Sequence, residues 1–544
     1  MYQNASDAVL VVGKESSGKS ELAANLTHRA PVSANFRGST VACEVYSHGT
    51  HHLVDTPGIL LSSDSLTTRI ALDRLKQHEK VMVVVKSTRL DEDLADLLPL
   101  VSGKQGIVVV TFWDKVQENR ARDTLNRLQA DLGVPVTAVD ARKINSEQRS
   151  CIFEMLEKNA VFEKKSLTWR AGWKIEPVRG LLDVPVLGVL LAVLLLFLPA
   201  GAAVWAANSF AALVEPWVNR LFEPLVSGAQ NLPRLLGEML SGQYGLLSMG
   251  PLMFVWAVPT VLLYALLLGA YKASGLAERL TIALHPAVRP FGLTGRDVLR
   301  VVMGFGCNVP AVISTRSCSV CTRGSTIAAI SFGSACSYQF GATLAVFAAA
   351  GLPNLIWLYM LVLAGSTLLY TRLTTSKQML LSIQRLAVEP RNFFEIPSLR
   401  SIWREMRLTI VQFFGTALPV FFVITLIASL LNGIGLLNFL SGLLTPIMAA
   451  FRLPPEAALP VVLASIRKDG LLLLAQPDLS ASLTGTQLLT GVYLGGVLLP
   501  CLVTALTIAR EQSIGFALRL MARQAFAAVV FTLAIAWSGM LFAK

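Results

Sequence analysis

Charged side chains are scarce in this chain of 544 residues, since Asp, Glu, Lys and Arg make up only 15% of it. Soluble domains carry about 25%, and hydrophobic residues here reach 53%. These values argue against a wholly soluble protein and indicate a polytopic membrane protein. The apolar excess begins only after about residue 170, so we expect a soluble N-terminal domain followed by a membrane domain.

Acidic residues are fewer than basic ones, 35 against 47, which gives a formal net charge of +12. The basic excess lies in connecting loops and is not interleaved with aromatic residues, so it indicates membrane topology and not nucleic-acid binding. The seven cysteines form no disulfide framework, which favours a reducing cytosolic side. We expect no cleavable signal, because the first apolar run leads into a charged loop.

The first motif is typical of a phosphate-binding loop. An apolar run of strand type at residues 8–12 precedes the sequence GKESSGKS, and a helical pattern follows from Glu21. Glycines let backbone N–H groups turn toward the phosphates, Lys19 would neutralise the β- and γ-phosphates, and Ser20 would bind Mg²⁺. The predicted phosphate-binding residues are Gly13, Ser16, Ser17, Gly18, Lys19 and Ser20.

A second motif supplies the rest of a nucleotide-hydrolysing site. The sequence LVDTPG at residues 53–58 ends a strand with Asp55, an acid for the Mg²⁺ shell, and Gly58, whose amide would meet the γ-phosphate. Thr40 would complete the metal site as a switch-loop residue, and Ser39 and Thr40 are both predicted to bind the nucleotide. Lys19, Thr40 and Gly58 are therefore the predicted catalytic residues. No Gln or His closely follows Gly58, so we expect slow hydrolysis.

Further strand runs at residues 81–85, 107–110 and 134–139 alternate with helical stretches, which predicts a parallel α/β sheet with nucleotide at the strand ends. Residues 111–115 follow one such strand, where a GTPase places NKxD. Asp114 would accept hydrogen bonds from guanine, although Thr111 replaces the usual Asn. The backbone amide of Ala141 would meet the guanine O6. The pattern favours GTP with relaxed discrimination against ATP.

Gly, Pro and Asn gather within an apolar region at residues 304–316, GFGCNVPAVISTR. Each of these residue types loosens a helix or adds a polar group. Loosened backbone survives in hydrocarbon only where protein or a water-filled cavity shelters it. We therefore predict a broken helix lining a path, with Cys307 and Asn308 at the break. The alternative is a cytosolic loop between two spans.

A shift of 160 residues aligns this region with a second one without gaps. The aligned residues include Gly, Pro and Phe, and Cys307-Asn308 fall on Arg467-Lys468, with Asp469 next. We expect Lys468 to pair with Asp469. The approach to the first copy is rich in Arg and Lys, whereas that to the second holds only Arg452, so the positive-inside rule predicts an inverted repeat. Coincidence and ordinary kinked helices are the alternative.

The predicted fold is an α/β P-loop GTPase domain followed by a polytopic α-helical membrane domain with an inverted repeat and two re-entrant gate segments. Seven full spans are expected near residues 184–207, 252–271, 327–350, 355–370, 408–431, 488–509 and 525–542. The predicted divisions are a GTPase-like domain at 1–165, a short linker at 166–182, a first membrane half at 183–370 with gate 1 at 298–316, a basic cytosolic connector at 371–407, and a second half at 408–544 with gate 2 at 461–476.

Several of these motifs, in this order, resemble the ferrous iron transport protein B (FeoB) family over nearly the whole chain. They are NFRGSTV at 35–41, SGLAER at 274–279, GLTGR at 292–296, GFGCNVPA at 304–311, Lys468-Asp469, and Pro500-Cys501 with Arg510-Glu511. The resemblance implies a bacterial inner-membrane importer with a cytoplasmic N-terminal domain, using GTP and Mg²⁺ to control Fe²⁺ uptake. Small cytosolic accessory proteins and a homo-oligomer are further expectations from the resemblance.

Fe²⁺ is a borderline-soft ion, which suits thiol ligands better than an all-oxygen site. The predicted ligands of the transported ion are Cys307, Cys336 and Cys501, with oxygen ligands from Asn308 and Asp469. We expect nucleotide-driven movement to reach the membrane through residues 145–179.

The sequence departs from the family in three places. Only about residues 145–176 are available for the family's helical spacer, Ser16 replaces an Asn tied to K⁺ stimulation, and Thr111 degrades the guanine motif. Mn²⁺ or another divalent ion is therefore an alternative cargo. Two further alternatives are a membrane-anchored regulatory GTPase without transport and an ion-driven transporter of nucleosides or another organic solute.

Overall fold

A six-stranded sheet forms the N-terminal domain of the computed structural model, in the order β2-β3-β1-β4-β5-β6. The strands are β1 (Val9–Gly13), β2 (Glu44–His48), β3 (His51–Asp55), β4 (Lys80–Lys86), β5 (Gln105–Thr111) and β6 (Val136–Ala138). The central strands are Val-rich and buried on both faces, as parallel strands covered by helices are. All neighbours pair in parallel except β2 and β3, which form an edge hairpin.

The structure describes most of the chain. The described residues are 8–28, 43–49, 51–59, 66–116, 118–163, 170–172, 175–177, 179–242, 245–318, 320–377, 380, 393–394, 396–397 and 399–542.

Helices cover both faces of this sheet, and each face has its own apolar core. They are α1 (Lys19–Leu26), α2 (Leu66–Gln77), α3 (Leu90–Val101), α4 (Glu118–Leu132) and α5 (Ser146–Glu157). Asn145 caps α5 by accepting from the backbone N–H of Gln148. Ile152 and Phe153 of α5 then pack against the sheet. The stretch expected to serve as a spacer is thus partly absorbed into the N-terminal domain.

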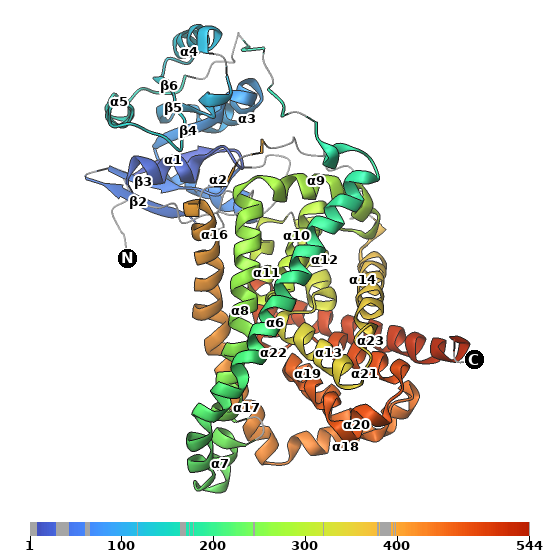
Figure 1. The fold of residues 1–544 in the computed structure, drawn as a ribbon. Coiled ribbons are helices and arrows are strands. Elements are labelled where there is room, and N and C mark those ends of the chain that lie inside the picture. Colours follow the sequence, from blue (N-terminus) through green and yellow to red (C-terminus); the bar gives the residue numbers. More distant parts are fainter. Residues whose placement is uncertain are drawn as a thin grey trace.

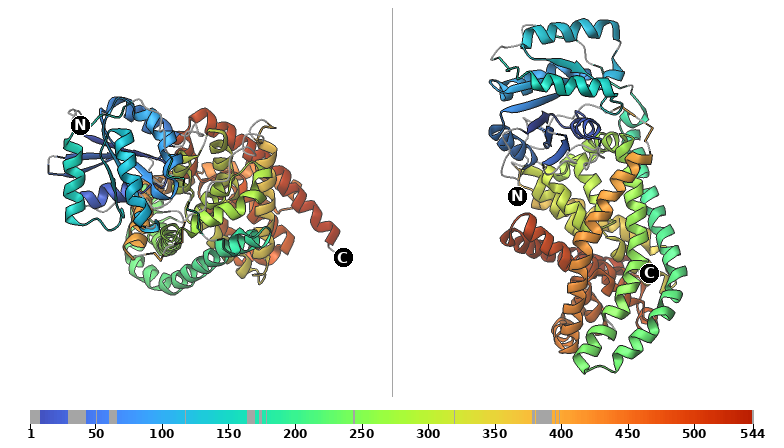
Figure 2. Two further views of the ribbon diagram at one scale, coloured as in Figure 1. Left: turned by 90° about the horizontal axis from the view of Figure 1, so that it is seen from above. Right: turned by 90° about the vertical axis from the view of Figure 1, so that its left-hand side faces the viewer.

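The helical domain lies directly beneath the sheet domain (Figure 1). Its first half contains α6 (Leu187–Gln230), α7 (Arg234–Ser241), α8 (Leu246–Ala273), α9 (Leu276–Val288), α10 (Gly295–Gly304), α11 (Asn308–Ser314), α12 (Val320–Gly333), α13 (Ser337–Ala349) and α14 (Leu355–Thr374). Its second half contains α16 (Leu399–Gln412), α17 (Leu418–Gly433), α18 (Leu436–Met448), α19 (Ala458–Ile466), α20 (Pro477–Ser482), α21 (Gly485–Val497), α22 (Leu502–Glu511) and α23 (Ile514–Phe542). The two further views in Figure 2 show the same stacking of the two domains.

Five helical segments among the described residues are long and apolar enough to cross a membrane, at 187–230, 254–273, 355–374, 485–511 and 514–538. Three of the seven expected spans are not single long helices. The one expected at 488–509 is divided into α21 and α22 at residues 498–501. The one expected at 327–350 is divided into α12 and α13 at Ser334–Cys336, and a π-helical turn, η6 (Phe413–Ala417), interrupts the one expected at 408–431. An apolar run long enough for one span can thus hold two helix ends that hydropathy does not detect.

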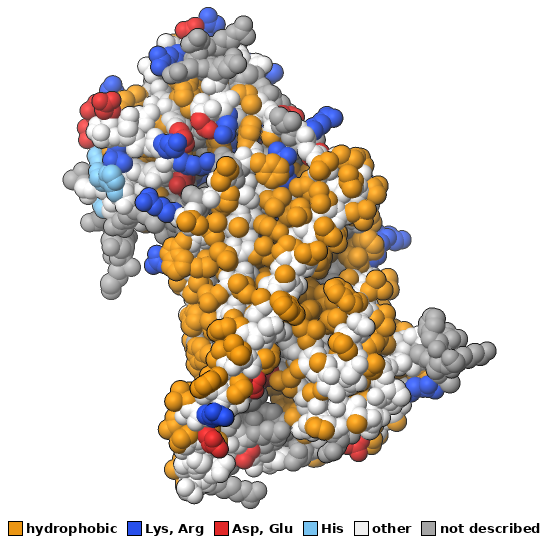
Figure 3. Space-filling view, viewed as in Figure 1, with side chains coloured by type: hydrophobic (Ala, Val, Ile, Leu, Met, Phe, Trp, Pro, Cys, Tyr) orange, Lys and Arg blue, Asp and Glu red, His pale blue; other side chains and the backbone are white. Residues whose placement is uncertain are grey.

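Large apolar side chains cover the surface of the helical domain, while charged residues gather on the sheet domain (Figure 3). Trp205, Trp357 and Phe526 are each more than 70% exposed. A soluble surface rarely carries so extended an apolar patch, and lipid removes its cost. The helical domain is therefore the membrane part of the chain.

The 160-residue repeat is present in the structure. Gly275 and Gly435 begin α9 and α18 with nearly the same left-handed backbone, φ 76° in both cases. Each helix contains a proline and ends in a 3₁₀ turn, η4 (Arg289–Phe291) or η7 (Ala449–Phe451). The corner α9–α10 lies next to the sheet domain, whereas α18 and α20 lie at the far end (Figure 1). The two copies are thus inverted, as the charge asymmetry predicts.

Gly295, the first residue of α10, allows α10 to lie against α9. A Cβ at this position would lie 1.7 Å from the carbonyl oxygen of Thr281. We expect Gly295→Ala to lower the thermal unfolding midpoint of the full-length protein in detergent, because backbone must move at a cost of about 1–3 kcal/mol.

The matched control is Gly365→Ala in α14, where a Cβ meets nothing within 4 Å. Replacing a helical glycine there should leave the midpoint unchanged or raise it slightly. Equal midpoints for the two variants would contradict the close approach of α9 and α10.

Candidate nucleotide site and metal path

The phosphate loop joins β1 to α1, with Gly18 in the left-handed conformation at the helix N-terminus. Lys19 is 5% exposed, and its ammonium donates to the carbonyl oxygens of Gly13 (3.1 Å) and Lys14 (2.8 Å). Burial lowers the pKa of Lys19, and the nearby carboxylates of Asp55, Glu15 and Asp93 oppose that effect. A lysine tied to its own loop in this way is positioned to exchange those carbonyls for phosphate oxygens.

Asp55 ends β3 beside this loop. Its Oδ2 accepts from the Ser20 hydroxyl at 2.5 Å, so two of the three predicted Mg²⁺ ligands lie together. Its Oδ1, like the hydroxyl of Ser17, is buried without a hydrogen-bond partner among the described residues. Burial raises the pKa of Asp55 to about 6, although Lys19 and the Ser20 hydroxyl act to lower it. An unpartnered buried carboxylate oxygen beside a hydroxyl suits a hard cation such as Mg²⁺.

Gly58 lies against the phosphate loop, as predicted for a residue that meets the γ-phosphate. The N–H of Ile59 donates to the Gly13 carbonyl at 3.1 Å. A Cβ at Gly58 would come within 2.5 Å of the Glu15 side chain, so only glycine allows this approach. The predictions for Ser39 and Thr40 lie outside the described residues.

Two of the three predicted base-binding residues, Thr111 and Ala141, lie against the same loop. The Thr111 hydroxyl donates to the Ser17 carbonyl (2.7 Å) and lies 3.1 Å from the Val85 carbonyl. A Cβ at Gly18 would lie 3.6 Å from Ala141 and 3.7 Å from Thr111. Asp114, on the turn η2 (Trp113–Lys115), pairs with Lys115 at 2.7 Å. Thr111 thus secures the phosphate loop even though it is not the usual Asn.

Gate 1 is a broken helix, as predicted. α10 ends at Gly304 and α11 begins at Asn308, with extended backbone at Cys307 between them. Asn308 is buried, and its amide donates to the Ser334 carbonyl at 3.4 Å. Its Oδ1 has no hydrogen-bond partner among the described residues. The break therefore presents one unused amide oxygen next to a thiol.

Gate 2 breaks at the aligned position, where Arg467 has the same extended backbone between α19 and the 3₁₀ helix η9 (Lys468–Ala475). The expected pairing of Lys468 with Asp469 is wrong, because Asp469 pairs with Arg467 through both carboxylate oxygens. The Lys468 ammonium donates instead to the carbonyls of Gly495, Gly496 and Leu499 at 2.6–3.1 Å. These carbonyls have lost their helical partners near the end of α21, and a cation satisfies them.

The predicted thiols lie at helix starts. Cys307, Cys336 and Cys501 are the residues immediately before α11, α13 and α22, and all three are free cysteines. Cys336 and Cys501 both lie within electrostatic range of Cys307. Among the described residues, however, no three His, Cys, Asp or Glu side chains are arranged to hold a metal ion. The three thiols therefore share a region, and Asp469 is engaged by Arg467.

The sequence reasoning missed the equivalence of Cys336 and Cys501. Both precede a helix with similar backbone (φ −59°, ψ 165° and φ −58°, ψ 152°), at a spacing of 165 residues instead of 160. A gapless shift of 160 does not align them, although a search allowing gaps would. The second break of each copy is thus also part of the repeat.

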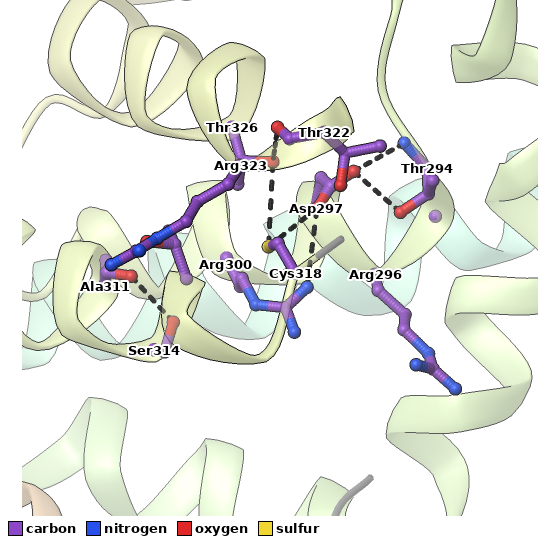
Figure 4. A network of polar contacts seen from close by, with 12 residues as sticks. Thr294, Arg296, Asp297, Arg300, Ala311, Ser314, Cys318, Thr322, Arg323 and Thr326 are labelled. Atoms are coloured by element: carbon purple, nitrogen blue, oxygen red, sulfur yellow. Dashed lines mark hydrogen bonds and ion pairs between the residues drawn. The ribbon is translucent and has the colours of Figure 1, made fainter. Parts of the chain in front are cut away.

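Ionic contacts on the sheet-domain side hold gate 1 in place. Arg316, just after α11, donates to both carboxylate oxygens of Glu511 in α22, at 2.7 and 2.6 Å, and Arg323 joins them at 3.3 Å. Around α10, Asp297 accepts from the Cys318 thiol and pairs with Arg300 at 3.4 Å (Figure 4). The helices that flank the break are thereby tied to α12 and α22 at this side.

The fold and the site define a P-loop GTPase-type domain joined to a polytopic helical membrane domain with paired helix breaks. Residues 7–150 match the family model described as ferrous iron transport protein B, and residues 246–351 match the model described as nucleoside recognition. The resemblance to the FeoB family drawn from the sequence is confirmed by these matches and by the curated proteins of that name to which the chain is similar.

Two curated relatives are similar over the same share of the chain. The Fe(2+) transporter FeoB of Synechocystis sp. is 26% identical over 356 residues, covering 57% of this chain and 56% of that protein. The Fe(2+) transporter FeoB of Helicobacter pylori strain J99 is 22% identical over 355 residues, covering 57% and 54%. The chain thus spans about half the length of these relatives.

Among solved structures, NFeoB from S. thermophilus bound to mGMPPNP is 18% identical, with 46% of this chain and 88% of that chain covered and a TM-score of 0.25. At that TM-score the likeness supports no argument about this chain.

Thr111→Val keeps the shape of the side chain and removes the hydroxyl that bonds the phosphate loop. We expect a loss of about 1–3 kcal/mol of local stability, because the buried Ser17 carbonyl loses its donor. Faster amide hydrogen exchange in residues 13–18 of the full-length protein would measure it. Thr111→Ser keeps the hydroxyl and should exchange like the parent, and equal exchange in all three proteins would contradict this role.

Proposed function

We propose that this protein imports Fe²⁺ across a bacterial inner membrane, and that GTP bound by its N-terminal domain controls the path. The observation that carries the proposal is the placement of three free thiols at helix breaks in one region, together with the Asn308 amide oxygen, which has no hydrogen-bond partner among the described residues. The family named in the two curated relatives supports Fe²⁺ as the cargo. The N-terminal domain of this protein lies in the cytosol, on the same side of the membrane as the arginine-rich corner formed by α9 and α10.

Sulfur and amide oxygen at helix breaks suit a borderline-soft divalent ion better than an organic solute. We propose that Cys307, Cys336 and Cys501 carry the ion in succession, with Asn308 Oδ1 as an oxygen ligand and Asp469 joining when Arg467 releases it. Successive weak binding by few ligands lets an ion leave as well as enter. A transport path therefore differs from the closed ligand cage of a resident metal.

Lys468 is a second element of this path. Its ammonium lies within electrostatic range of Cys336 and Cys501. A fixed positive charge beside the thiols opposes a divalent cation, and its three carbonyl acceptors hold it there. We propose that opening of the path separates Lys468 from the end of α21.

The nucleotide half of the proposal is supported by the residues that fit Mg²⁺ and phosphate. Ser20 and Asp55 would hold Mg²⁺, which neutralises charge on the β- and γ-phosphates. Lys19 would bind the phosphates, Gly58 and Thr40 would sense the γ-phosphate, and Thr111, Asp114 and Ala141 would border the base. Hydrolysis is slow because the segment after Gly58 offers no Gln or His close by. Small accessory proteins and self-association belong to the same proposal.

Transport and hydrolysis are separable by two variants. We expect Cys307→Ser to reduce Fe²⁺ uptake into reconstituted vesicles at least tenfold while GTP hydrolysis stays intact, because serine keeps the shape and loses the soft ligand. Lys19→Ala should abolish hydrolysis and uptake together.

The matched control is Cys151→Ser in α5, a cysteine remote from the gates. Full uptake by Cys307→Ser would exclude the thiol path. Hydrolysis without uptake of any divalent metal by the parent protein would favour a regulatory GTPase instead, and competition by Mn²⁺ would test the choice of cargo.

The raised pKa of Asp55 predicts a pH dependence of Mg²⁺-dependent nucleotide binding. With a pKa of about 6, the carboxyl holds a proton below pH 6 that Mg²⁺ must displace. Affinity should therefore fall about fourfold from pH 7.5 to 5.5, following the ionised fraction. Titrations with GDP and Mg²⁺ measure it. Asp55→Asn should show only the dependence of the nucleotide's own phosphates, and identical pH profiles would contradict this assignment.

A further inference from the structure

The phosphate loop of the N-terminal domain contacts the membrane domain, which lies beneath the sheet domain (Figure 1). In the phosphate loop, Glu15 pairs with Arg296 of α10 at 3.3 Å, and the Ser16 hydroxyl donates to Glu278 of α9 at 3.5 Å. At the base end, the Lys115 ammonium lies 5.8 Å from the ring centre of Phe393 in the connector. The phosphate loop therefore contacts the membrane domain, and the turn at the predicted base end lies close to the connector.

Glu15 lies at the γ-phosphate end of the loop. Its side chain is 4% exposed and contacts Gly58, the residue predicted to meet the γ-phosphate. Arg296 reaches this carboxylate from the first turn of α10 and is partly exposed. A terminal phosphate bound beside Gly58 would thus enter the same small region as the carboxylate of Glu15 and the guanidinium of Arg296.

Arg296 is directed differently from the other charged residues of α10. Asp297 and Arg300 join the network around Cys318, whereas Arg296 extends away from that network (Figure 4). Guanidinium binds phosphate oxygens in bidentate fashion, and a γ-phosphate carries more negative charge than one carboxylate. A γ-phosphate is therefore a stronger partner for Arg296 than Glu15 is.

We propose that Arg296 is a γ-phosphate sensor, through which the membrane domain distinguishes a nucleoside triphosphate from a diphosphate. With diphosphate or no nucleotide, Arg296 pairs with Glu15. With triphosphate, the γ-phosphate takes the guanidinium from Glu15. The inference rests on the proposed binding of GTP by the N-terminal domain.

α10 connects this sensor to gate 1. Arg296 is its second residue and Cys307 follows its end by three residues, so the rigid helix spans about 12 Å from the sensor to its end before the break. A shift of Arg296 toward the phosphate would move α10 along with it. The signal then reaches Cys307 directly, in addition to the route expected through residues 145–179.

The test compares the affinities of the full-length protein in nanodiscs for GMPPNP and for GDP. We expect Arg296→Gln to lower the ratio of GMPPNP affinity to GDP affinity about tenfold, because only GMPPNP has the phosphate that Arg296 binds. Arg296→Lys keeps the charge and should restore part of the ratio. Arg289→Gln removes an exposed arginine of the same corner and should leave the ratio unchanged.

Glu15→Gln should change the ratio in the opposite direction, because it frees Arg296 for the γ-phosphate, and the double variant should resemble Arg296→Gln alone. This second variant keeps the test decisive if Arg296→Gln does not fold. An unchanged ratio in either single variant, with normal GMPPNP binding by the parent, would overturn the sensor and leave GTP binding standing. Absence of GMPPNP binding by the parent would overturn the proposed function as well.

Discussion

The ion pair between Glu15 and Arg296 joins the phosphate loop of the N-terminal domain to the membrane domain. An acidic side chain that is almost fully buried beside a phosphate loop needs a cation, since an uncompensated buried charge costs several kcal/mol. Here the cation comes from the membrane domain, 281 positions further along the chain. The loop that would bind phosphate is therefore also a surface that contacts the membrane domain.

The membrane domain meets a related constraint at its helix breaks. Each break frees backbone groups that lipid cannot satisfy, and the chain satisfies some of them with side chains of fixed charge. Lys468 binds three carbonyls near the end of α21, Arg467 pairs with Asp469, and Arg316 binds Glu511 across to α22. The thiols of Cys307, Cys336 and Cys501 lie at the helix starts. In this arrangement the charged residues hold the breaks together, and the thiols are the groups proposed to carry a soft ion.

Local signals made much of this predictable. The phosphate-binding motif GxxxxGKS and Asp55 are each recognised from residues close in sequence, because each follows or ends a strand. The two left-handed glycines of the repeat are recognised because they recur at one fixed spacing. The hydrogen-bond partners of the charged side chains were harder to predict from the sequence. Lys468 bonds to carbonyls about 30 positions away, although Asp469 is its neighbour. The sequence did not predict that residues 327–350 are divided into two helices at Cys336, because the hydropathy is continuous there. Glu15 and Arg296 carry no sequence signal that joins them, so only the folded chain brings them together.

The most direct measurement of the central claim is cysteine cross-linking between the phosphate loop and α9 in native membranes. Ser16→Cys with Glu278→Cys places two thiols at a contact that spans 3.5 Å between side-chain oxygens in the parent. With each single variant as a control for the native cysteines, a short bifunctional maleimide should join the pair within the nucleotide-free chain. Failure of the pair to cross-link, with both cysteines shown to be reactive, would mean that the phosphate loop does not rest on the membrane domain.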